Sequence, residues 1–468
     1  MLVSMSRTLS VTTTAIPGLL LLDLPVHGDA RGWLKENWQR AKMTALGLPD
    51  FGPVQHTVAY NASAGVTRGI HAEPWDKFIS VAAGRMFGAW VDLREGPSFG
   101  SVVTAEVGPD TAVFVPRGVG NSYQTLEDDT VYSYLVNDHW SAESLADYTY
   151  LNLADETAAI HWPIPLSQAI ISAADAAHPR LAEVSPMPGR RTVIIGANGQ
   201  LGSSLRALLP DAVALGRAEL DLADPDSVDR FDWRGVGTII NAAGYTAVDA
   251  AETPQGRADC WRINVSGVAR LVARARQQRA RLVHISSDYV FDGTTPEHAE
   301  DESYSPLGVY GQTKAAADAL VATLDAHYIV RTSWVVGAGS NFVATMAALA
   351  ERGVNPAVVD DQIGRLTFTD DLAAAILHLL GSGVPFGCYN MTNAGPAQSW
   401  ADIAARVFEL SGRDPADVSR ISTEVYASGK QLAPRPRHST LKLDKLIATG
   451  FNPAAADDRL IAYLSPGQ

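Results

Sequence analysis

The segment GVTRGIHAEPWDK, residues 65–77, brings an arginine, a histidine, two carboxylates and a lysine together in one short stretch. A histidine can act as a general base near neutral pH, and a lysine ammonium can stabilise a developing oxyanion. Histidine and carboxylate side chains could instead coordinate a metal ion. The segment therefore indicates an acid–base centre, a metal centre or a solvated turn.

A second pattern lies in TVIIGANGQLG, where an apolar strand runs into Gly196, Gly199 and Gly202. The spacing is GxxGxxG. Small residues at such a turn let the backbone approach a pyrophosphate, which then rests on the N-terminus of the following helix. The strand before the glycines and the helix expected after them favour a nucleotide-binding site.

A third pattern is SPLGVYGQTKAAADAL, in which Tyr310 and Lys314 stand four residues apart at the start of a helical stretch and so share one face. A lysine ammonium beside a phenol favours the phenolate, so the pair predicts a general acid of lowered pKa. Upstream, HISSDYVFDG ends an expected strand with Ser286 and Ser287, and either hydroxyl could donate to a carbonyl oxygen.

The elements that position these residues change in character near residue 180. Before it, short apolar runs such as KFISVAAG, MFGAWVDLR, TAVFVPRG and TVYSYLV alternate with turn residues, which predicts an all-β sandwich or barrel. After it, apolar strands alternate with alanine-rich helices, which predicts a doubly wound α/β domain with a parallel sheet. We expect an all-β domain over residues 1–178, a proline-rich linker over 179–190 and an α/β domain over 191–468.

Composition narrows the class of protein. The 468 residues are 46% hydrophobic and 19% charged, which is typical of a globular chain of two or three domains. A net charge of −14 disfavours nucleic acid and anionic membrane surfaces as partners. The two cysteines form no paired motif and are expected as reduced thiols in a cytoplasmic protein. AIPGLLLLDLPV, from Ala15, is too short to span a bilayer and predicts a buried strand.

From about residue 190 the chain resembles the extended short-chain dehydrogenase/reductases, and among them the dTDP-4-dehydrorhamnose reductases. The resemblance rests on GANGQLG, NAAGYTAVDAAE, SSDYVFDG, VYGQTK, RTSWVVG, DDQIGRLT and APRPRHS. It implies a Rossmann fold with a small substrate-binding lobe. It also implies that Ser287 orients the substrate carbonyl, that Tyr310 donates the proton, and that Lys314 holds the nicotinamide ribose.

The same resemblance implies the binding residues. Trp334 and Arg435 are expected in the sugar-nucleotide pocket. Residues expected along NADPH or NADH are Gly196, Asn198, Gly199, Gln200, Leu201, Arg217, Asp221, Leu222, Ala242, Ala243, Tyr310 and Lys314. Arg217 follows the apolar AVAL and no acidic residue occupies that strand end, which favours NADPH. Some relatives use Mg²⁺ at a dimer interface, and the sequence leaves that point open.

The first domain has features of a cupin barrel, with Gly65 and His71 in one motif and Pro116 and Gly118 in another. Metal-binding cupins carry HxH with a glutamate in the first motif and a further histidine in the second. Here the first motif reads His71-Ala72-Glu73 and Asn121 replaces the later histidine, so two imidazoles are missing. We therefore predict a site without a metal.

This domain resembles the dTDP-4-dehydrorhamnose 3,5-epimerases over about residues 15–180. The matching segments are DARGWLKENW, GVTRGIHAEPWDK, VDLREGPSFG, VFVPRGVGNSYQTLED, TVYSYLVNDHWSAE and IHWPI. The resemblance implies His71 as the general base, Asp175 as its carboxylate partner, Lys77 as the enolate's partner and Tyr134, not Tyr132, as the proton donor. Arg31, Glu36 and Arg68 are expected to contact the sugar nucleotide. Glu73 and Asp76 are interpreted as rim or turn residues.

Two positions depart from the epimerase pattern. Asn121 stands where the family usually has a histidine, and Gly88 where it usually has an aspartate. They look like linked changes, and they leave open whether both sugar centres are inverted.

Together, these resemblances predict a bifunctional enzyme acting on a dTDP-4-keto-6-deoxy sugar, first by 3,5-epimerisation and then by NAD(P)H-dependent reduction at C4. A homodimer through the cupin domain is expected by the same analogy. The alternatives are a related epimerase/4-ketoreductase with a different stereochemical endpoint, or a catalytically silent nucleotide-binding regulatory module.

Overall fold

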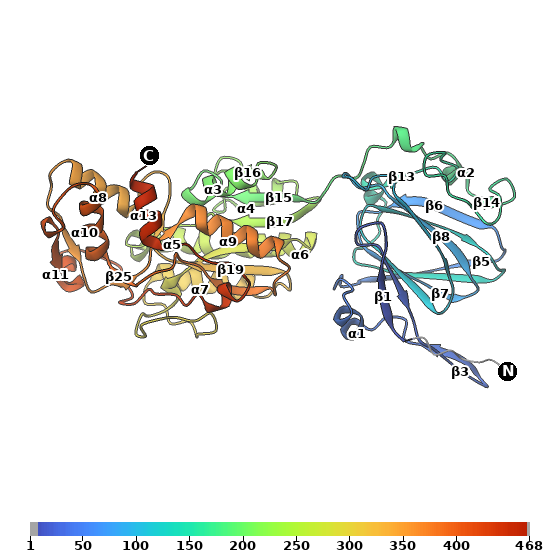
Figure 1. The fold of residues 1–468 in the computed structure, drawn as a ribbon, viewed down its shortest axis with the longest axis horizontal. Helices are drawn as coiled ribbons and strands as arrows, with labels where there is room; N and C mark the ends of the chain where they lie inside the picture. Colours follow the sequence, from blue (N-terminus) through green and yellow to red (C-terminus); the bar gives the residue numbers. More distant parts are fainter. Residues whose placement is uncertain (1–7, 466–468) are drawn as a thin grey trace. The chain divides into compact units, whose positions relative to one another are not determined.

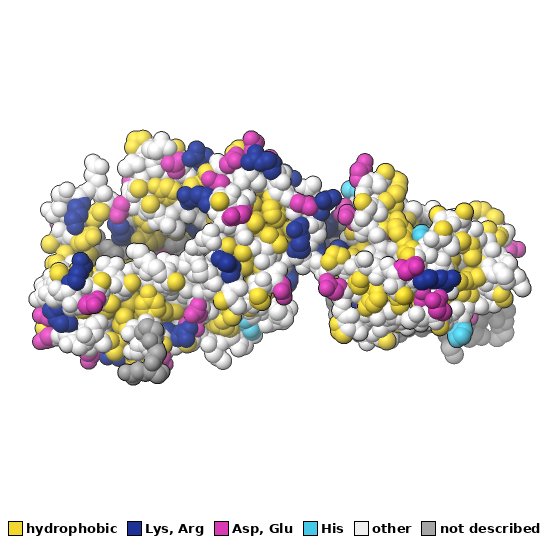
Figure 2. Space-filling model, turned by 90° about the horizontal axis from the view of Figure 1, so that it is seen from above, with side chains coloured by type: hydrophobic (Ala, Val, Ile, Leu, Met, Phe, Trp, Pro, Cys, Tyr) yellow, Lys and Arg dark blue, Asp and Glu magenta, His cyan; other side chains and the backbone are white. Residues whose placement is uncertain are grey.

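The computed structural model describes residues 8–465, and these fall into two compact units, one ending at Gly189 and the other beginning at Arg190 (Figure 1). Among the described residues, no helix combines the length and apolar character needed to cross a membrane. On the face in Figure 2, Lys and Arg side chains are interspersed with Asp and Glu side chains on both units.

The first unit is built mainly from two six-stranded sheets. The strands of one sheet, in spatial order, are β1 (Ser10–Thr13), β2 (Leu20–Asp23), β10 (Thr111–Val115), β7 (Lys77–Ala83), β12 (Thr130–Val136) and β5 (Gln55–Asn61). Those of the other are β13 (Thr149–Tyr150), β6 (Val66–Ala72), β11 (Val119–Thr125), β8 (Met86–Asp92) and β9 (Val102–Val107), with β14 (Ile170–Ile171) beside β6. A separate hairpin joins β3 (Val26–Asp29) to β4 (Gly32–Lys35), and the helices are α1 (Arg40–Ala45) and α2 (Ala173–Ala176).

The two sheets face each other across an apolar core. Ile79 and Val113 from the first sheet pack with Met86 and Trp90 from the second, and all four are buried. The predicted cupin-like β-domain is therefore confirmed, and the strands predicted from KFISVAAG, MFGAWVDLR, TAVFVPRG and TVYSYLV correspond to β7, β8, β10 and β12. The predicted strand in AIPGLLLLDLPV is also confirmed, as β2.

Most of the segment expected to act as a linker packs against the first unit. Leu181 and Met187 are buried in a cluster with residues of β6 and β8, and Met187 also bridges to Arg94. The proline-rich composition predicted a linker, but the Leu181 and Met187 side chains within it are buried against the β-domain. The division between the compact units accordingly falls at Gly189.

The second unit centres on a parallel six-stranded sheet, which confirms the predicted doubly wound fold. Its strands, in spatial order, are β16 (Val213–Leu215), β15 (Arg191–Ile195), β17 (Val236–Asn241), β18 (Arg281–Ser287), β19 (His327–Thr332) and β24 (Gly387–Asn390). One face packs against α3 (Gln200–Leu208) and α9 (Thr369–Gly381), and the other against α4 (Pro225–Arg230), α6 (Val268–Gln278) and α7 (Val309–Val321). The order changes direction between β15 and β17, the place where such sheets bind ligands.

The remaining elements complete the second unit. A smaller apolar cluster forms a lobe around α8 (Phe342–Glu351), α10 (Trp400–Leu410) and α13 (Ala456–Leu464). Other helices are α5 (Pro254–Trp261), α11 (Thr423–Ala427) and α12 (Asp444–Ile447). Short strand pairs are β20 (Val335–Val336) with β23 (Thr367–Phe368), β21 (Ala357–Val359) with β26 (Ser419–Ile421), and β22 (Ile363–Gly364) with β25 (Gln398–Ser399).

Candidate active sites

A cavity of about 670 Å³ opens where β15, β17 and β18 end in the second unit. Two glycines shape the turn from β15 to α3 that borders it. Gly196 has a φ of +80°, and a Cβ there would lie 2.7 Å from the Ala243 nitrogen. A Cβ at Gly202 would lie 2.2 Å from the Gly196 oxygen. Only glycine fits at both positions, and the close approach leaves the N-terminus of α3 open to the cavity.

This cavity fits a dinucleotide cofactor. It adjoins the switch between β15 and β17, and a helix N-terminus can hold the phosphates. Every residue expected along the cofactor lines it: Gly196, Asn198, Gly199, Gln200, Leu201, Arg217, Asp221, Leu222, Ala242, Ala243, Tyr310 and Lys314. The lining also includes residues that the motifs did not single out, among them Tyr245, Val248, Ile263 and Tyr289.

The end of β16 carries both a basic and an acidic residue. Arg217 is exposed at the edge of the cavity. Glu219, two residues later, folds back so that its carboxylate accepts a hydrogen bond from the Gly216 N–H at 2.8 Å. The sequence prediction rested on the strand end alone, and Glu219 lies just beyond it.

Ser287, Tyr310 and Lys314 reach the same cavity from two elements. Ser287 is the last residue of β18, and Tyr310 and Lys314 lie on the first turns of α7. The Lys314 ammonium donates to the Ile285 carbonyl at 2.5 Å. Burial lowers the pKa of Lys314 to about 8, whereas burial raises the pKa of Tyr310 well above its usual value. The expected lowering of the phenol's pKa is thus not seen, because burial and the charge of Asp288 raise it and the hydrogen bond with Ser287 only partly opposes that rise.

Asp288 is a buried carboxyl that sequence reasoning did not single out. It accepts a hydrogen bond from the Ser287 hydroxyl at 2.9 Å, and it lines the cavity. Burial raises the pKa of Asp288 to about 6, and hydrogen bonds from Ser439 and Ser287 oppose that rise. Its place directly after Ser287 in SSDYVFDG was the available signal.

The expected sugar-nucleotide residues of the second unit lie in two places. Trp334 lines the cavity and stacks on Trp400, with ring centroids 3.7 Å apart. Arg435 forms an ion pair with Asp249 at 2.8 Å. The Tyr289 ring packs edge-on against Tyr310 at 5.5 Å and is next to Arg435, so it connects the ion pair to the cavity.

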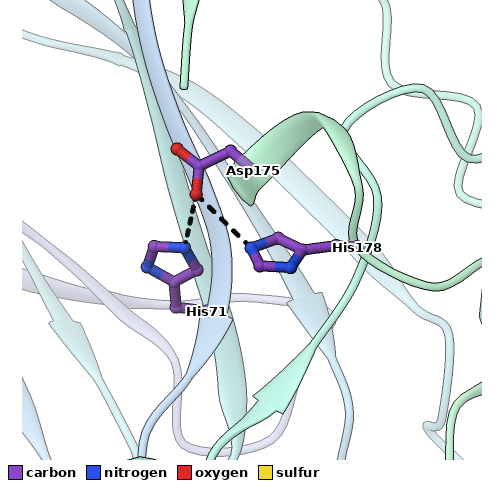
Figure 3. A group of neighbouring side chains, drawn as sticks. All are labelled: His71, Asp175 and His178. Atoms are coloured by element: carbon purple, nitrogen blue, oxygen red, sulfur yellow. Dashed lines mark hydrogen bonds and ion pairs between the residues drawn. The ribbon is translucent and has the colours of Figure 1, made fainter. Parts of the chain in front are cut away.

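In the first unit, β6 and α2 bring His71 and Asp175 together although they are 104 residues apart (Figure 3). Their Nε2 and Oδ1 atoms are 2.9 Å apart. Burial alone would raise the pKa of Asp175, but the hydrogen bond from His71 and the charges nearby hold it below its usual value. With Asp175 ionised, Nε2 carries the proton of a neutral His71 ring, and Nδ1 is left as the basic nitrogen.

Lys77 lies between a carboxylate and an aromatic ring. Its ammonium donates to Glu73 at 2.6 Å and lies 4.5 Å from the centre of the Tyr134 ring. Glu73 also accepts from the Trp75 indole at 2.5 Å. Glu73 was interpreted as a rim or turn residue, but its buried ion pair orients Lys77. Asp76 does hold a turn, because it accepts from the Arg117 backbone N–H and the Asn137 amide.

Trp90 connects the two positions that depart from the epimerase pattern. Its indole donates to Asn121 Oδ1 at 3.0 Å, and the Asn121 amide in turn donates to the Tyr132 hydroxyl at 3.2 Å. A Cβ at Gly88 would lie 2.3 Å from the Trp90 ring. A side chain at position 88 and the observed Trp90 ring therefore exclude each other, which explains why the two changes are linked.

The three remaining predicted contacts are dispersed. Arg31, on the β3–β4 hairpin, pairs with Asp29, and Glu36 pairs with Lys42; all four side chains are largely exposed. Arg68 is an exposed residue within β6 and lies beside Tyr123. Within the described residues, no direct contact links Arg31 or Glu36 to His71.

The folds and sites define a chain that joins a cupin-like acid–base enzyme domain to a dinucleotide-binding oxidoreductase domain. Residues 13–183 match the dTDP-4-dehydrorhamnose 3,5-epimerase family, and residues 190–466 match the family of the RmlD substrate binding domain. The chain belongs to both families. It is a fused epimerase and reductase of dTDP-L-rhamnose biosynthesis, as its sequence motifs predicted.

Individual relatives match one half each. The RmlC homologue of Streptococcus pyogenes is 48% identical over 177 residues, which are 37% of this chain and 89% of the relative. A dTDP-4-dehydrorhamnose reductase of Mycobacterium tuberculosis is 37% identical over 282 residues, 57% of this chain and 90% of the relative. The structure of the Bacillus anthracis reductase in complex with NADP is 32% identical, covers 59% of this chain and 98% of its own, and has a TM-score of 0.55.

Proposed function

We propose that the first site inverts C3 and C5 of dTDP-4-dehydro-6-deoxy-D-glucose, and that the second reduces the resulting 4-keto sugar to dTDP-L-rhamnose. The observation that carries the proposal is the pairing of His71 with Asp175 in one unit while Ser287, Tyr310 and Lys314 line one cavity in the other. Each constellation has the groups that its reaction needs.

In the epimerase step, the 4-keto group acidifies the protons on both neighbouring carbons. His71 removes such a proton through Nδ1, and Asp175 stabilises the imidazolium that forms. The Lys77 ammonium stabilises the enolate oxygen, and Tyr134 returns a proton on the opposite face. Lys77 lies over the Tyr134 ring, which supports the assignment of these two residues to one site.

In the reductase step, bound NADPH supplies the hydride that reaches C4. Tyr310 donates the proton to the carbonyl oxygen, and Ser287 hydrogen-bonds that oxygen. The high pKa of Tyr310 keeps the phenol protonated until charge develops on the substrate. Lys314 is near enough to the strand end to hold the nicotinamide ribose, as expected from the family, and its ammonium favours the phenolate that remains.

NADPH is proposed over NADH because Arg217 stands exposed at the cavity edge beyond β16, where a 2′-phosphate is held in this type of fold. The nearby Glu219 is engaged with the Gly216 N–H. Replacing Arg217 with Ala should raise the KM for NADPH about tenfold and leave the KM for NADH nearly unchanged. Equal changes in both constants would exclude this role for Arg217.

A homodimer through the β-domain is proposed on the family analogy and on the exposed β3–β4 hairpin. Trp33 and Leu34 on this hairpin are 47% and 73% exposed, and Arg31 lies beside them. A partner covering this hairpin would bury apolar surface and could place Arg31 near a second site. Light scattering should give a dimer for the full chain and a weakened dimer for Leu34→Glu. A monomeric wild-type chain would reject the proposal.

A second stereochemical outcome is supported by Asn121 and Gly88, which stand where the family usually has a histidine and an aspartate; the Trp90 indole donates to Asn121 instead. Loss of those groups could restrict inversion to one carbon. Proton NMR of the product made by the full chain with NADPH distinguishes the outcomes. We expect the rhamnose configuration, and retention of the starting configuration at C3 or C5 would establish the single-centre alternative.

A further inference from the structure

The partly buried His178 is an unexplained neighbour of the proposed epimerase base. It follows α2, and its ring stacks on Tyr150 at 4.6 Å and meets the His71 ring edge-on at 5.3 Å. Its Nε2 lies 3.3 Å from the same Asp175 oxygen that accepts from His71, yet among residues 8–465 it finds no partner with hydrogen-bond geometry. Figure 3 shows both imidazoles converging on that oxygen. A buried imidazole nitrogen without a partner is unfavourable.

The three converging atoms match a transition-metal site. His71 Nε2, Asp175 Oδ1 and His178 Nε2 lie within 4.8 Å of one another. Zinc binds nitrogen and carboxylate oxygen at about 2.0–2.2 Å, so two ligands of a tetrahedral site are separated by about 3.4 Å. The observed separations from Asp175 are 2.9 and 3.3 Å, so small side-chain rotations would open the group around an ion.

We propose that His71, Asp175 and His178 bind Zn²⁺ or a similar divalent transition metal, and that the bound ion inhibits the epimerase. This set differs from the cupin set considered in the sequence, because two of its members come from the segment beyond the barrel strands. It has two imidazoles and one carboxylate, with the fourth position left for water.

The inhibition follows from the two nitrogens of His71 and rests on the proposed role of this residue as the base. Without a metal, the ring proton resides on Nε2 and faces Asp175, and Nδ1 has the lone pair that accepts the substrate proton. A metal takes the Nε2 lone pair, so the ring proton moves through solvent to Nδ1. The ring then has no free lone pair, and Asp175 is engaged by the ion.

The test is solvent-deuterium exchange into the 4-keto sugar by the full chain, with Zn²⁺ or Mg²⁺ added. Zn²⁺ should suppress exchange, whereas Mg²⁺ at the same concentration should not, since it prefers oxygen ligands. His178→Gln should retain exchange and require at least about tenfold more Zn²⁺ for half-inhibition. The matched control is His161→Gln, which removes an exposed histidine of the same unit and should leave the zinc sensitivity unchanged.

A second readout does not depend on catalysis. Co²⁺ added to the wild-type chain should give the visible absorption of a low-coordinate nitrogen-ligated ion, and His178→Gln should lose it. A wild-type chain without that absorption, or a His178→Gln variant with unchanged zinc sensitivity, overturns the metal site. If Co²⁺ binding requires His178 and Zn²⁺ still leaves exchange intact, the inhibition is overturned together with His71 as the base. NADPH oxidation with pre-epimerised substrate should resist Zn²⁺, and equal loss of both activities overturns a specific site.

Discussion

At the scale of single residues, Trp90 limits which residues positions 88 and 121 can hold. The ring occupies the space that any side chain at 88 would need, and its indole N–H uses the oxygen of Asn121. The two departures from the epimerase pattern are therefore one structural change. Trp90 is fully buried, so the ring cannot move away without disturbing the core between the sheets.

Substitution of Gly88 by Ala tests this packing. The added Cβ would lie 2.3 Å from a rigid buried ring, and we expect the β-domain to lose about 1–3 kcal/mol of stability. Calorimetry of the full chain measures this as a lower Tm of the β-domain transition. Gly28→Ala is the control, because a Cβ there meets only the Gly32 oxygen at 3.7 Å. Equal shifts for both variants would contradict the assigned role of Trp90.

Asp288 should make the stability of the reductase unit depend on pH. Burial raises the pKa of Asp288 from 3.8 to about 6, so between these values the folded state holds more protons than the unfolded state. The contribution of Asp288 therefore favours folding below pH 3.8 and weakens as the pH rises to 6, by up to about 3 kcal/mol. Asp288→Asn should remove that slope.

The slope can be measured by denaturant unfolding at several pH values, following the transition that NADPH shifts. Asp292→Asn serves as the control. Hydrogen bonds from the backbone and side chain of Thr294 lower the pKa of Asp292, so its contribution to stability is lost only at pH values below the ordinary aspartate range. A wild-type slope that persists in Asp288→Asn would show that another group titrates in this window.

At the scale of elements, the short helix α2 places Asp175 beside His71. Ser172 caps it by accepting from the Asp175 N–H at 3.0 Å, so the residue whose N–H is capped also carries the proposed catalytic carboxylate. The elements that carry the reductase residues depend less on a single cap. Both β18 and α7 are longer than α2, and they pack directly against each other in the core.

Removal of the α2 cap should therefore affect chemistry more than global stability. We expect Ser172→Ala to loosen α2 by about 1 kcal/mol and to lower the rate of deuterium exchange severalfold, with NADPH oxidation of pre-epimerised substrate unchanged. Ser422→Ala is a matched control, since Ser422 caps α11 in the second unit in the same way. Exchange that is equally slow in both variants would rule out a specific role of α2.

At the scale of the whole molecule, fusion places a reversible step and the step that consumes its product on one chain. The epimerisation equilibrium is then drawn forward by reduction. This kinetic benefit requires only that the intermediate reaches the second site, by diffusion through solvent if necessary.

Mixing two inactive variants tests this diffusion. His71→Ala should abolish deuterium exchange, and Tyr310→Phe should abolish NADPH oxidation while exchange continues. Neither variant alone should form dTDP-L-rhamnose, but a mixture of the two should form it after a lag, which NMR of the product would detect. A mixture that remains inactive, although each variant retains its other activity, would show that the intermediate does not leave the chain.

The sequence by itself determined the two folds and much of the reductase site. The glycines at 196–202 and the Tyr310–Lys314 spacing are local patterns, and a strand followed by a helix can place them in only a few ways. All the expected cofactor residues accordingly line one cavity. The two family resemblances also rested on ordered motifs, which are local patterns of the same kind.

Only the tertiary structure decided the environment of these residues. Burial, which depends on residues far away in the sequence, raised the pKa of Tyr310 against the expected effect of Lys314. Glu73 proved to be the partner of Lys77, and Trp90 joined positions 88 and 121. His178 converges with His71 because the chain returns to β6 after the barrel strands, and no local pattern encodes such a long-range contact.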